Sequence, residues 1–205
     1  MERSAIVLAG GFSTRLGQDK GLVKLMDTPL VRHVLDKTKN LVDETLIIVS
    51  SDAQAEKYKE VLHSDEKIKV DNAKAHSPLA GTAVGFQEAS GKYSLLLPCD
   101  APLVSKKILQ LLLELCINRN AAIPRWPSCY IEPLQAVYCT EAALRASEEA
   151  LSSGEVKMQA MVDRLRGVRY VSTLVLEQLD SELNTFFNVN TTLDLKKAES
   201  ILKRK

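Results

Sequence analysis

The sequence predicts a three-layer α/β/α domain, in which a mostly parallel, mixed sheet lies between two layers of helices. Three observations favour this fold class. Runs such as SAIVLA (4–9) and YSLLLP (93–98) are apolar without alternation, as in strands that are buried on both faces. Amphipathic helical segments separate these runs, an order typical of parallel sheets. The chain has 205 residues, 45% of them apolar and 26% charged, which suits one globular domain.

Strands and helices alternate along the first half of the chain. Strands are predicted at 4–9, 45–51, 67–71 and 92–100, and helices at 28–41, 53–62, 78–90 and 104–119. Pro78 supports the start of its helix, because proline is favoured in the first turn. The second half is less regular, with strands expected at 120–126, 133–139 and 167–173 and helices at 140–154 and 156–165. A last amphipathic helix follows a cap at Thr191 or Thr192.

Charge and cysteine content argue against several classes of protein. The net charge is +1, from 27 basic and 26 acidic residues, so no nucleic-acid partner is expected. The four cysteines form no CxxC pair and have no histidine at zinc-ligand spacing, which favours reduced thiols in a cytoplasmic protein over a structural zinc site. No run approaches ~20 apolar residues and the first apolar run is too short for a signal peptide, so no membrane association is expected.

The first loop, LAGGFSTRLGQDKG (8–21), combines glycine with positive charge directly after the first strand. Ligands of parallel sheets bind at the carboxyl ends of the strands. Glycines at such a place let backbone N–H groups approach an anion closely, and Arg15 and Lys20 add charge that suits a triphosphate. A glycine turn with solvated Arg15 and Lys20 is the simpler alternative.

Two familiar phosphate-binding motifs do not fit this loop. A P-loop has four residues between its glycines and then Lys and Ser or Thr, whereas five residues separate Gly11 from Gly17 and Gln18 follows. The Gly-x-Gly-x-x-Gly fingerprint of dinucleotide-binding domains is missing as well, which disfavours a redox enzyme of Rossmann type.

Asp100 closes the apolar strand that ends in PCD, so its carboxylate is expected to face the same crevice as the first loop. Mg²⁺ takes one or two carboxylates together with ligand phosphates. The alternative role for Asp100 is the N-cap of the following helix.

Five segments together resemble the molybdenum cofactor guanylyltransferases, a family of nucleotidyltransferases with a GT-A-like fold. They are LAGGFSTRLGQDKG at 8–21, SPLAG at 77–81, PCDAP at 98–102, EPLQAVY at 132–138, and NVNT at 188–191 with Asp194 and Leu195 after it. Many nucleotidyltransferases share the first segment, whereas its QDKG ending and the later segments narrow the resemblance to this family. Ser77 stands where the family has glycine, and Thr192 where it has proline.

The resemblance implies a Rossmann-like nucleotidyltransferase fold and a single domain over 1–205, with a nucleotide-binding half (1–103) and an acceptor-binding half (104–205). It implies that GMP passes from GTP to the terminal phosphate of the molybdenum–molybdopterin cofactor, with release of diphosphate. Mg²⁺ would be the cofactor, held by Asp100. Transient contact with cofactor-delivery proteins or molybdoenzymes is also implied.

The same resemblance assigns roles to individual residues. The implied catalytic residues are Arg15, Lys20 and Asp100. The implied nucleotide contacts are Leu8, Ala9, Gly10, Gly11, Lys20, Ser50, Asp71 and Asp100, and the implied acceptor contacts are Asn188 and Asn190. From the residues alone, Asp71 could be a turn aspartate, Ser50 an ordinary strand end, and the asparagines an Asx turn that caps the last helix. Trp126 is expected to pack within the protein rather than to stack on a pterin.

Two other functional classes stay open. A nucleotidyltransferase with another acceptor, such as a sugar 1-phosphate, a cytidylyl acceptor or a cobinamide phosphate, would share the first loop and Asp100. It would not be expected to combine QDKG, SPLAG and NVNT. A non-catalytic nucleotide-binding domain would be expected to lose Lys20 or Asp100, and both are present.

Overall fold

The structure, a computed structural model, describes residues 2–13, 18–71 and 77–204. A seven-stranded sheet in the order β11-β9-β10-β8-β1-β6-β7 forms its centre. Within the described residues β10 alone runs antiparallel to its neighbours, so the sheet is mixed and mostly parallel, as predicted. The strands are β1 (Arg3–Leu8), β6 (Glu44–Val49), β7 (Glu66–Val70), β8 (Tyr93–Pro98), β9 (Ala121–Arg125), β10 (Ala136–Cys139) and β11 (Val168–Ser172).

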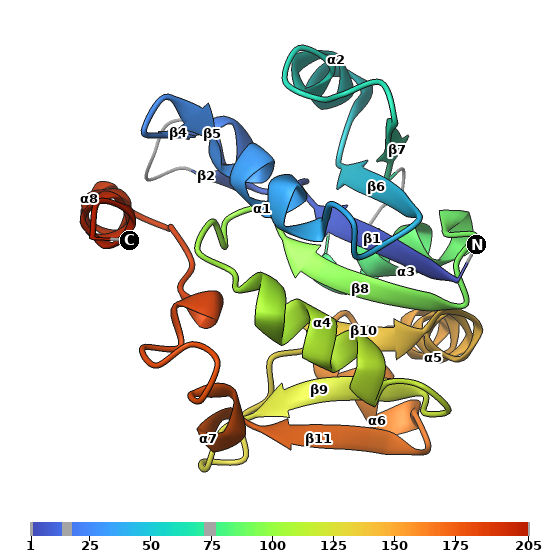
Figure 1. Cartoon of the computed structure of the whole chain (residues 1–205). Coiled ribbons are helices and arrows are strands. Elements are labelled where there is room, and N and C mark those ends of the chain that lie inside the picture. The colour runs from blue at the N-terminus through green and yellow to red at the C-terminus, as the bar shows by residue number, and fades with distance from the viewer. Residues whose placement is uncertain (1, 14–17, 72–76, 205) are drawn as a thin grey trace.

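Helices cover both faces of the sheet, which confirms the three layers (Figure 1). One face carries α1 (Leu30–Thr38), α2 (Asp52–Lys59) and α4 (Lys106–Leu115), and the other carries α3 (Pro78–Glu88), α5 (Thr140–Ser152) and α6 (Met158–Arg164). Successive residues of a strand point to opposite faces. Val7 therefore packs in the core beneath α1 and α4, whereas its neighbour Ile6 packs in the core beneath α3 and α5.

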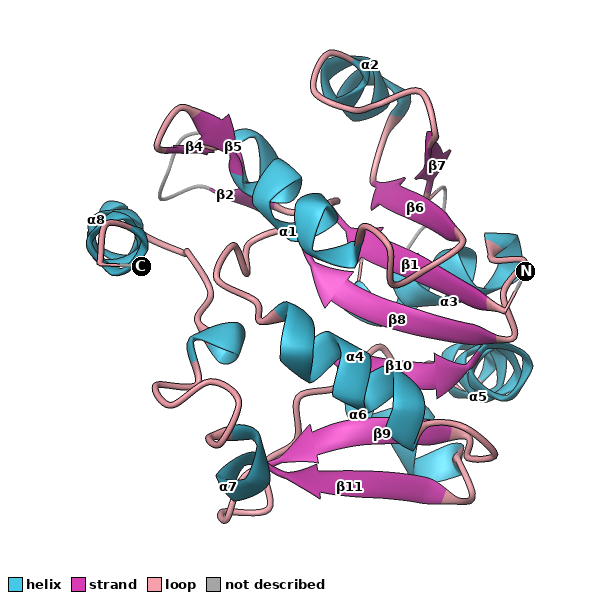
Figure 2. Ribbon diagram, viewed as in Figure 1, coloured by secondary structure: helices cyan, strands magenta, loops and turns pink. Residues whose placement is uncertain are grey.

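The C-terminal segment returns to the region of the first loop. After α7 (Thr173–Leu176) and the 3-10 turn η2 (Asn184–Phe186), α8 (Thr192–Leu202) packs against β4 (Lys24–Leu25), which pairs with β5 (Thr28–Pro29). Figure 2 shows α8 on the same side of the molecule as this pair. Val189 and Ala198 share an apolar cluster with Val23, Leu25 and Leu30. The Val189 N–H donates to the Asp100 carbonyl at 2.8 Å, so the chain before α8 lies against the end of β8.

The predicted elements are confirmed, mostly with narrower bounds. The helix expected over 28–41 begins at Leu30, because Thr28 and Pro29 pair with β4. The helix expected to reach Gly154 ends at Ser152. Sequence reasoning missed the β2–β3 hairpin (Phe12–Ser13 with Gln18–Asp19), η1 (Lys20–Leu22), the β4–β5 pair and α7, since elements this short show no periodicity.

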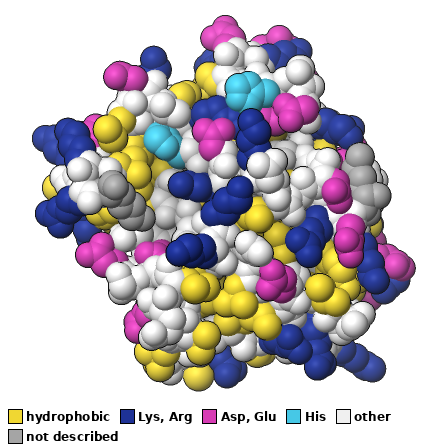
Figure 3. Space-filling view, viewed as in Figure 1, with side chains coloured by type: hydrophobic (Ala, Val, Ile, Leu, Met, Phe, Trp, Pro, Cys, Tyr) yellow, Lys and Arg dark blue, Asp and Glu magenta, His cyan; other side chains and the backbone are white. Residues whose placement is uncertain are grey.

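Charged side chains of both signs are interspersed over the face that carries α1 and α4 (Figure 3), in keeping with the net charge of +1. In the part of the chain that the structure describes, no helix combines the length and the apolar character needed to span a membrane. All four cysteines, which lie within that part, are free thiols.

Candidate active site

A cavity of about 310 Å³ opens at the carboxyl ends of four adjacent strands, β8, β1, β6 and β7. The sheet register brings these ends level, because Leu8 pairs with Ile48 on one side and with Pro98 on the other. The loops that follow the strands therefore converge, and the start of α3 adds Ser77 and Pro78 to the wall. Seven of the predicted nucleotide contacts line this cavity: Leu8, Gly10, Gly11, Lys20, Ser50, Asp71 and Asp100.

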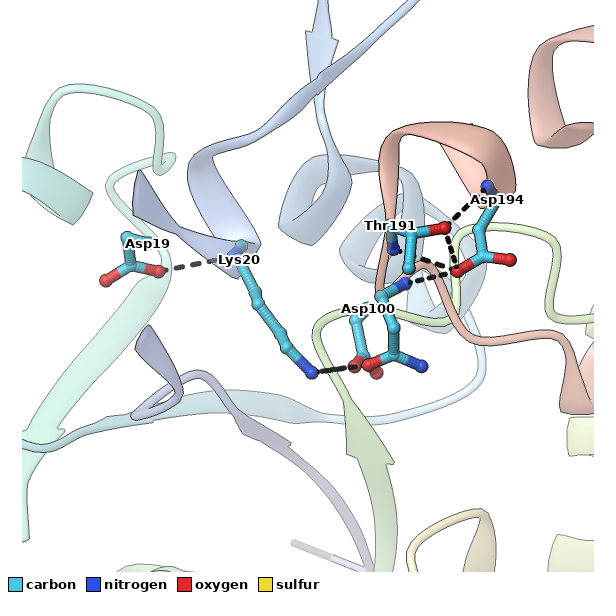
Figure 4. A network of polar contacts seen from close by, with 7 residues as sticks. Asp19, Lys20, Asp100, Thr191 and Asp194 are labelled. Carbon is cyan, nitrogen blue, oxygen red and sulfur yellow. Dashed lines mark hydrogen bonds and ion pairs between the residues drawn. The ribbon is translucent and has the colours of Figure 1, made fainter. Parts of the chain in front are cut away.

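Lys20, Asp100 and Asn190 form a polar cluster at this cavity. Lys20 Nζ lies 3.1 Å from Asp100 Oδ2 and donates to Asn190 Oδ1 at 2.6 Å. In Figure 4 the Lys20 side chain extends from the first loop toward Asp100, with Thr191 and Asp194 close by. The cluster joins the first loop, the end of β8 and the segment before α8. A half-buried cation beside a carboxylate is suited to a ligand that carries phosphates and a metal ion.

Asp100 is not a helix cap. Its residue is 9% exposed and its carboxylate accepts from Lys20, whereas Ser105 occupies the N-cap position of α4. The alternative of a capping aspartate is therefore wrong, and the carboxylate faces the crevice as the strand position predicts.

The asparagines of the NVN segment do not cap α8 either. Thr191 is the N-cap: its hydroxyl accepts from the Asp194 N–H at 3.1 Å, and Asp194 Oδ2 accepts from the Thr191 N–H at 2.9 Å. Asp194 Oδ2 also accepts from the backbone N–H of Asn190 at 3.1 Å. The side chain of Asn190 takes no part in this cap, and its Oδ1 accepts from Lys20. Burial acts to raise the pKa of Asp194, but the Thr191 hydroxyl and the two backbone N–H groups hold it below its ordinary value. Asn188 is exposed, and the structure does not bring it to Lys20 or Asp100.

Asp71 and Ser50 lie in the cavity wall on the side of β6 and β7. Asp71 is 5% exposed, and its carboxylate lies beside α3, where a Cβ at Gly81 would be at an ordinary contact distance of 3.7 Å from Oδ2. The Ser50 hydroxyl lies 3.1 Å from the Gly10 carbonyl, to which it can donate. This arrangement is compatible with the implied nucleotide contacts.

Ala9 is the predicted nucleotide contact that does not line the cavity. Its N–H donates to the Ile48 carbonyl at 2.7 Å, and its carbonyl accepts from Gln54 Nε2 at 2.8 Å. Both backbone groups of Ala9 therefore have partners within the protein. Arg15 lies outside the described residues, so its catalytic role stays a prediction.

Sequence reasoning missed Gln54 and Tyr58, which lie behind the cavity on α2. The helix is polar along its length, so nothing in its pattern marks Gln54 as buried. The departure at Ser77 has a structural reason, because its hydroxyl accepts from the Ala80 N–H at 3.1 Å and caps α3. Trp126 packs edge-to-face against Phe186 at 5.6 Å between ring centroids and donates to Glu132 Oε1 at 2.7 Å, as expected of a packing residue.

The fold and this site define a nucleotidyltransferase, and comparison with known proteins agrees. Residues 5–169 match the model of the MobA-like NTP transferase domain. The fold is shared with 2-C-methyl-D-erythritol 4-phosphate cytidylyltransferase from Thermus thermophilus, with a TM-score of 0.72, 17% identity, and coverage of 99% of this chain and 100% of that one. At this level of identity the likeness concerns the fold alone.

Closer relatives narrow the class to one family. The chain is 35% identical over 198 residues to a probable molybdenum cofactor guanylyltransferase of Methanosarcina mazei, covering 94% of this chain and 88% of the relative. It is 30% identical over 184 residues to the molybdenum cofactor guanylyltransferase of Pseudomonas entomophila, covering 89% and 92%. The crystal structure of molybdopterin-guanine dinucleotide biosynthesis protein A from Archaeoglobus fulgidus matches with a TM-score of 0.83 and 30% identity, covering 98% and 100%. The chain belongs to the molybdenum cofactor guanylyltransferase family.

Proposed function

We propose that the chain transfers GMP from GTP to the terminal phosphate of the molybdenum–molybdopterin cofactor, giving the guanine dinucleotide cofactor and diphosphate. The observation that carries this proposal is the Lys20–Asp100–Asn190 cluster, in which residues implied to contact the nucleotide and a residue implied to contact the acceptor lie within hydrogen-bond distance. Family membership supports the choice of both substrates.

The cavity offers an apolar wall with a few polar groups, as small-molecule sites usually do. Leu8 and Ile48 provide apolar surface for the nucleoside, and Ser50 and Asp71 provide polar groups that would fix its orientation. Lys20 would then meet the triphosphate, and Asn190 would lie on the side from which the acceptor phosphate approaches.

The reaction needs positioning and charge stabilisation more than covalent help from the protein. An oxygen of the acceptor's terminal phosphate attacks the α-phosphorus of GTP. The bond from that phosphorus to the bridging oxygen breaks, and diphosphate leaves with this oxygen. A phosphate monoester is mostly ionised at neutral pH, since its second pKa is about 6, so a strong general base is not required. Lys20 would stabilise the negative charge that develops in the transition state.

We propose Mg²⁺ as the cofactor, with Asp100 as its protein ligand. Among the described residues, no three His, Cys, Asp or Glu side chains gather as a metal cage. A single buried carboxylate nevertheless suits Mg²⁺, which keeps several waters and takes its other ligands from substrate phosphates. When bound, the ion would neutralise phosphate charge beside Lys20. Arg15 would hold the departing diphosphate.

The test is an assay with purified protein, Mg²⁺, molybdopterin cofactor and each nucleoside triphosphate in turn. We expect diphosphate release and dinucleotide formation with GTP, and much less of both with CTP, ATP or UTP. Diphosphate release with a sugar 1-phosphate but not with the pterin would contradict the proposal and favour another acceptor class.

We also propose a cytoplasmic location, because the free thiols suit a reducing compartment. Transient contact with cofactor-delivery proteins or molybdoenzymes would let the product reach its users. Cross-linking in cell extract, followed by mass spectrometry of proteins that carry molybdopterin, would test this contact.

A further inference from the structure

The Gln54 side chain, on α2, contacts the first loop (8–21) near both of its ends. Its Nε2 donates to the Ala9 carbonyl at 2.8 Å, near the start of the loop, and to Asp19 Oδ2, near its end. Its Oε1 accepts from the Ser50 N–H at 2.8 Å. These partners fix which end of the amide points where, because one end can only donate and the other can only accept. One nearly buried side chain thus ties together the ends of β1 and β6 and the residue before Lys20.

Among the described residues, three donors hold Asp19. Besides Gln54, the Tyr58 hydroxyl donates to Asp19 Oδ1 at 2.7 Å, and the Gly21 N–H donates to the same oxygen at 3.2 Å. Tyr58 is fully buried, and this burial, with Cys99 and Asp19 nearby, raises the pKa of its hydroxyl, which therefore stays protonated. These donors occupy Asp19, and Lys20 reaches Asp100 and Asn190 instead.

Tyr58 approaches the loop closely because residue 21 is glycine. A Cβ at Gly21 would lie 2.1 Å from the Tyr58 hydroxyl oxygen and 3.0 Å from Tyr58 Cζ. The last glycine of the first loop therefore serves the contact with α2.

We propose that Gln54 and Tyr58 are positioning residues of the active site, which hold Asp19 and thereby place the Lys20 ammonium group where it meets the triphosphate. Neither side chain touches the substrate in this role. The identity of the nucleotide rests on the proposed function, whereas the network of contacts does not depend on it. α2 lies outside the five segments that carry the family resemblance, so the role extends the site to an element that the motifs leave out.

A double-mutant cycle between Tyr58→Phe and Lys20→Ala tests this role. GTP affinity is measured by titration calorimetry, kcat/KM by diphosphate release, and folding by thermal unfolding. Loss of a hydrogen bond to a charged group should lower affinity and kcat/KM about tenfold in the Tyr58→Phe variant. In the Lys20→Ala background the same change should cost less than about twofold, since there is no ammonium group left to place. Losses that multiply would overturn the proposal. Tyr170→Phe, a hydroxyl removal on β11, is the matched control and should leave both values unchanged.

A charge rearrangement gives a second, independent measurement. Gln54→Glu keeps the shape and the acceptor for the Ser50 N–H, but it cannot donate to Ala9 and it faces Asp19 with like charge. Its loss of GTP affinity should exceed that of Tyr58→Phe and be partly rescued by Asp19→Asn, whose amide can donate to the new carboxylate. A failure of rescue in a folded double variant would contradict the proposal.

GTP binding and transfer by the wild-type protein distinguish a failure of this proposal from a failure of the proposed function. If it binds GTP but transfers nothing to molybdopterin, the proposed function fails, and the cycle on GTP affinity still decides the role of α2. If it binds no nucleoside triphosphate, both proposals are overturned.

Discussion

At the residue scale, Asp100 lies just after the central strand β8 and contacts Lys20, which is eighty residues earlier in the chain. We expect Asp100→Ala to abolish transfer, because the variant removes the carboxylate proposed to hold Mg²⁺. The fold should survive, since the sheet and its cores do not depend on this side chain. Diphosphate release and thermal unfolding measure the two effects. Mg²⁺-dependent turnover in a folded Asp100→Ala protein would remove Asp100 from the mechanism.

Lys20 is a cation of the site that we propose meets the triphosphate. Lys20→Ala should lower kcat by at least ~10²-fold, as expected when a preorganised charge-stabilising donor is removed. Lys24→Ala is the matched control, because Lys24 is exposed on β4, four residues further along the chain. Near-normal kinetics of the Lys20→Ala variant would contradict a role of Lys20 in catalysis.

Gly21 allows a stability test of the contact between the first loop and α2. A methyl group at position 21 would overlap the Tyr58 hydroxyl, so Gly21→Ala should lower the free energy of unfolding by about 1–3 kcal/mol, as for other overpacked sites. Gly11→Ala is the comparison, because among the described residues a Cβ there would meet only Lys20 Cδ, at 3.9 Å. Urea denaturation measures both variants. Equal stability of the two would show that the region around Tyr58 relaxes freely.

At the scale of elements, α8 places Asn190 through its capping box. Asp194→Ala removes the acceptor for the Asn190 and Thr191 N–H groups and should lower the free energy of unfolding by about 1 kcal/mol, a usual value for a lost cap. It should also weaken substrate binding, because the backbone that carries Asn190 loses its anchor. Asp163→Ala in the exposed part of α6 is the control. Unchanged stability and unchanged KM for both substrates would contradict the role of the cap.

The elements show how far sequence reasoning reaches. Strand and helix positions were predictable, because apolar runs and helical spacing are local signals. The convergence of Lys20 and Asp100 was predictable too, because both residues follow the carboxyl ends of parallel strands. The network of Gln54, Tyr58 and Asp19 was not predictable, because burial of a polar helix depends on contacts between residues about 35 to 40 positions apart. Thr191 rather than an asparagine caps α8, a choice that the local sequence left open.

At the scale of the whole molecule, the two predicted halves contribute unequally to the cavity. Its lining comes mainly from 1–103, and the second half adds Leu134 to the wall and Asn190 to the Lys20 cluster. This distribution suits a nucleotide site completed by an acceptor side, while the division at residue 103 stays a prediction. At the opposite, amino-terminal edge of the same four strands lies the buried carboxylate of Glu44, which we expect to stabilise the fold rather than to take part in catalysis.

Glu44 ties this amino-terminal edge together. It is 6% exposed at the start of β6 and accepts from the Ser4 hydroxyl of β1 at 2.7 Å and from the Ser90 N–H before β8, with Lys67 of β7 at 3.3 Å. Burial acts to raise the pKa of Glu44, but Ser4, Ser90 and Lys67 together hold it below its ordinary value. Because the folded-state pKa lies below the unfolded value of about 4.3, the ionised group stabilises the fold above that pH. This stabilisation is lost as the pH falls through the folded-state pKa.

Glu44→Gln should therefore lower the free energy of unfolding at pH 7 by about 1–3 kcal/mol, because the amide cannot accept from all three donors. The gap between wild type and variant should close as the pH falls from about 5 to 3, where the wild-type carboxylate also becomes neutral. Urea denaturation across this pH range measures the gap, with Glu141→Gln as the control, since Glu141 pairs with Arg145 on an exposed face of α5. A gap that stays constant from pH 7 to 3 would mean that the charge of Glu44 does not hold the strand edge, and that only its shape does.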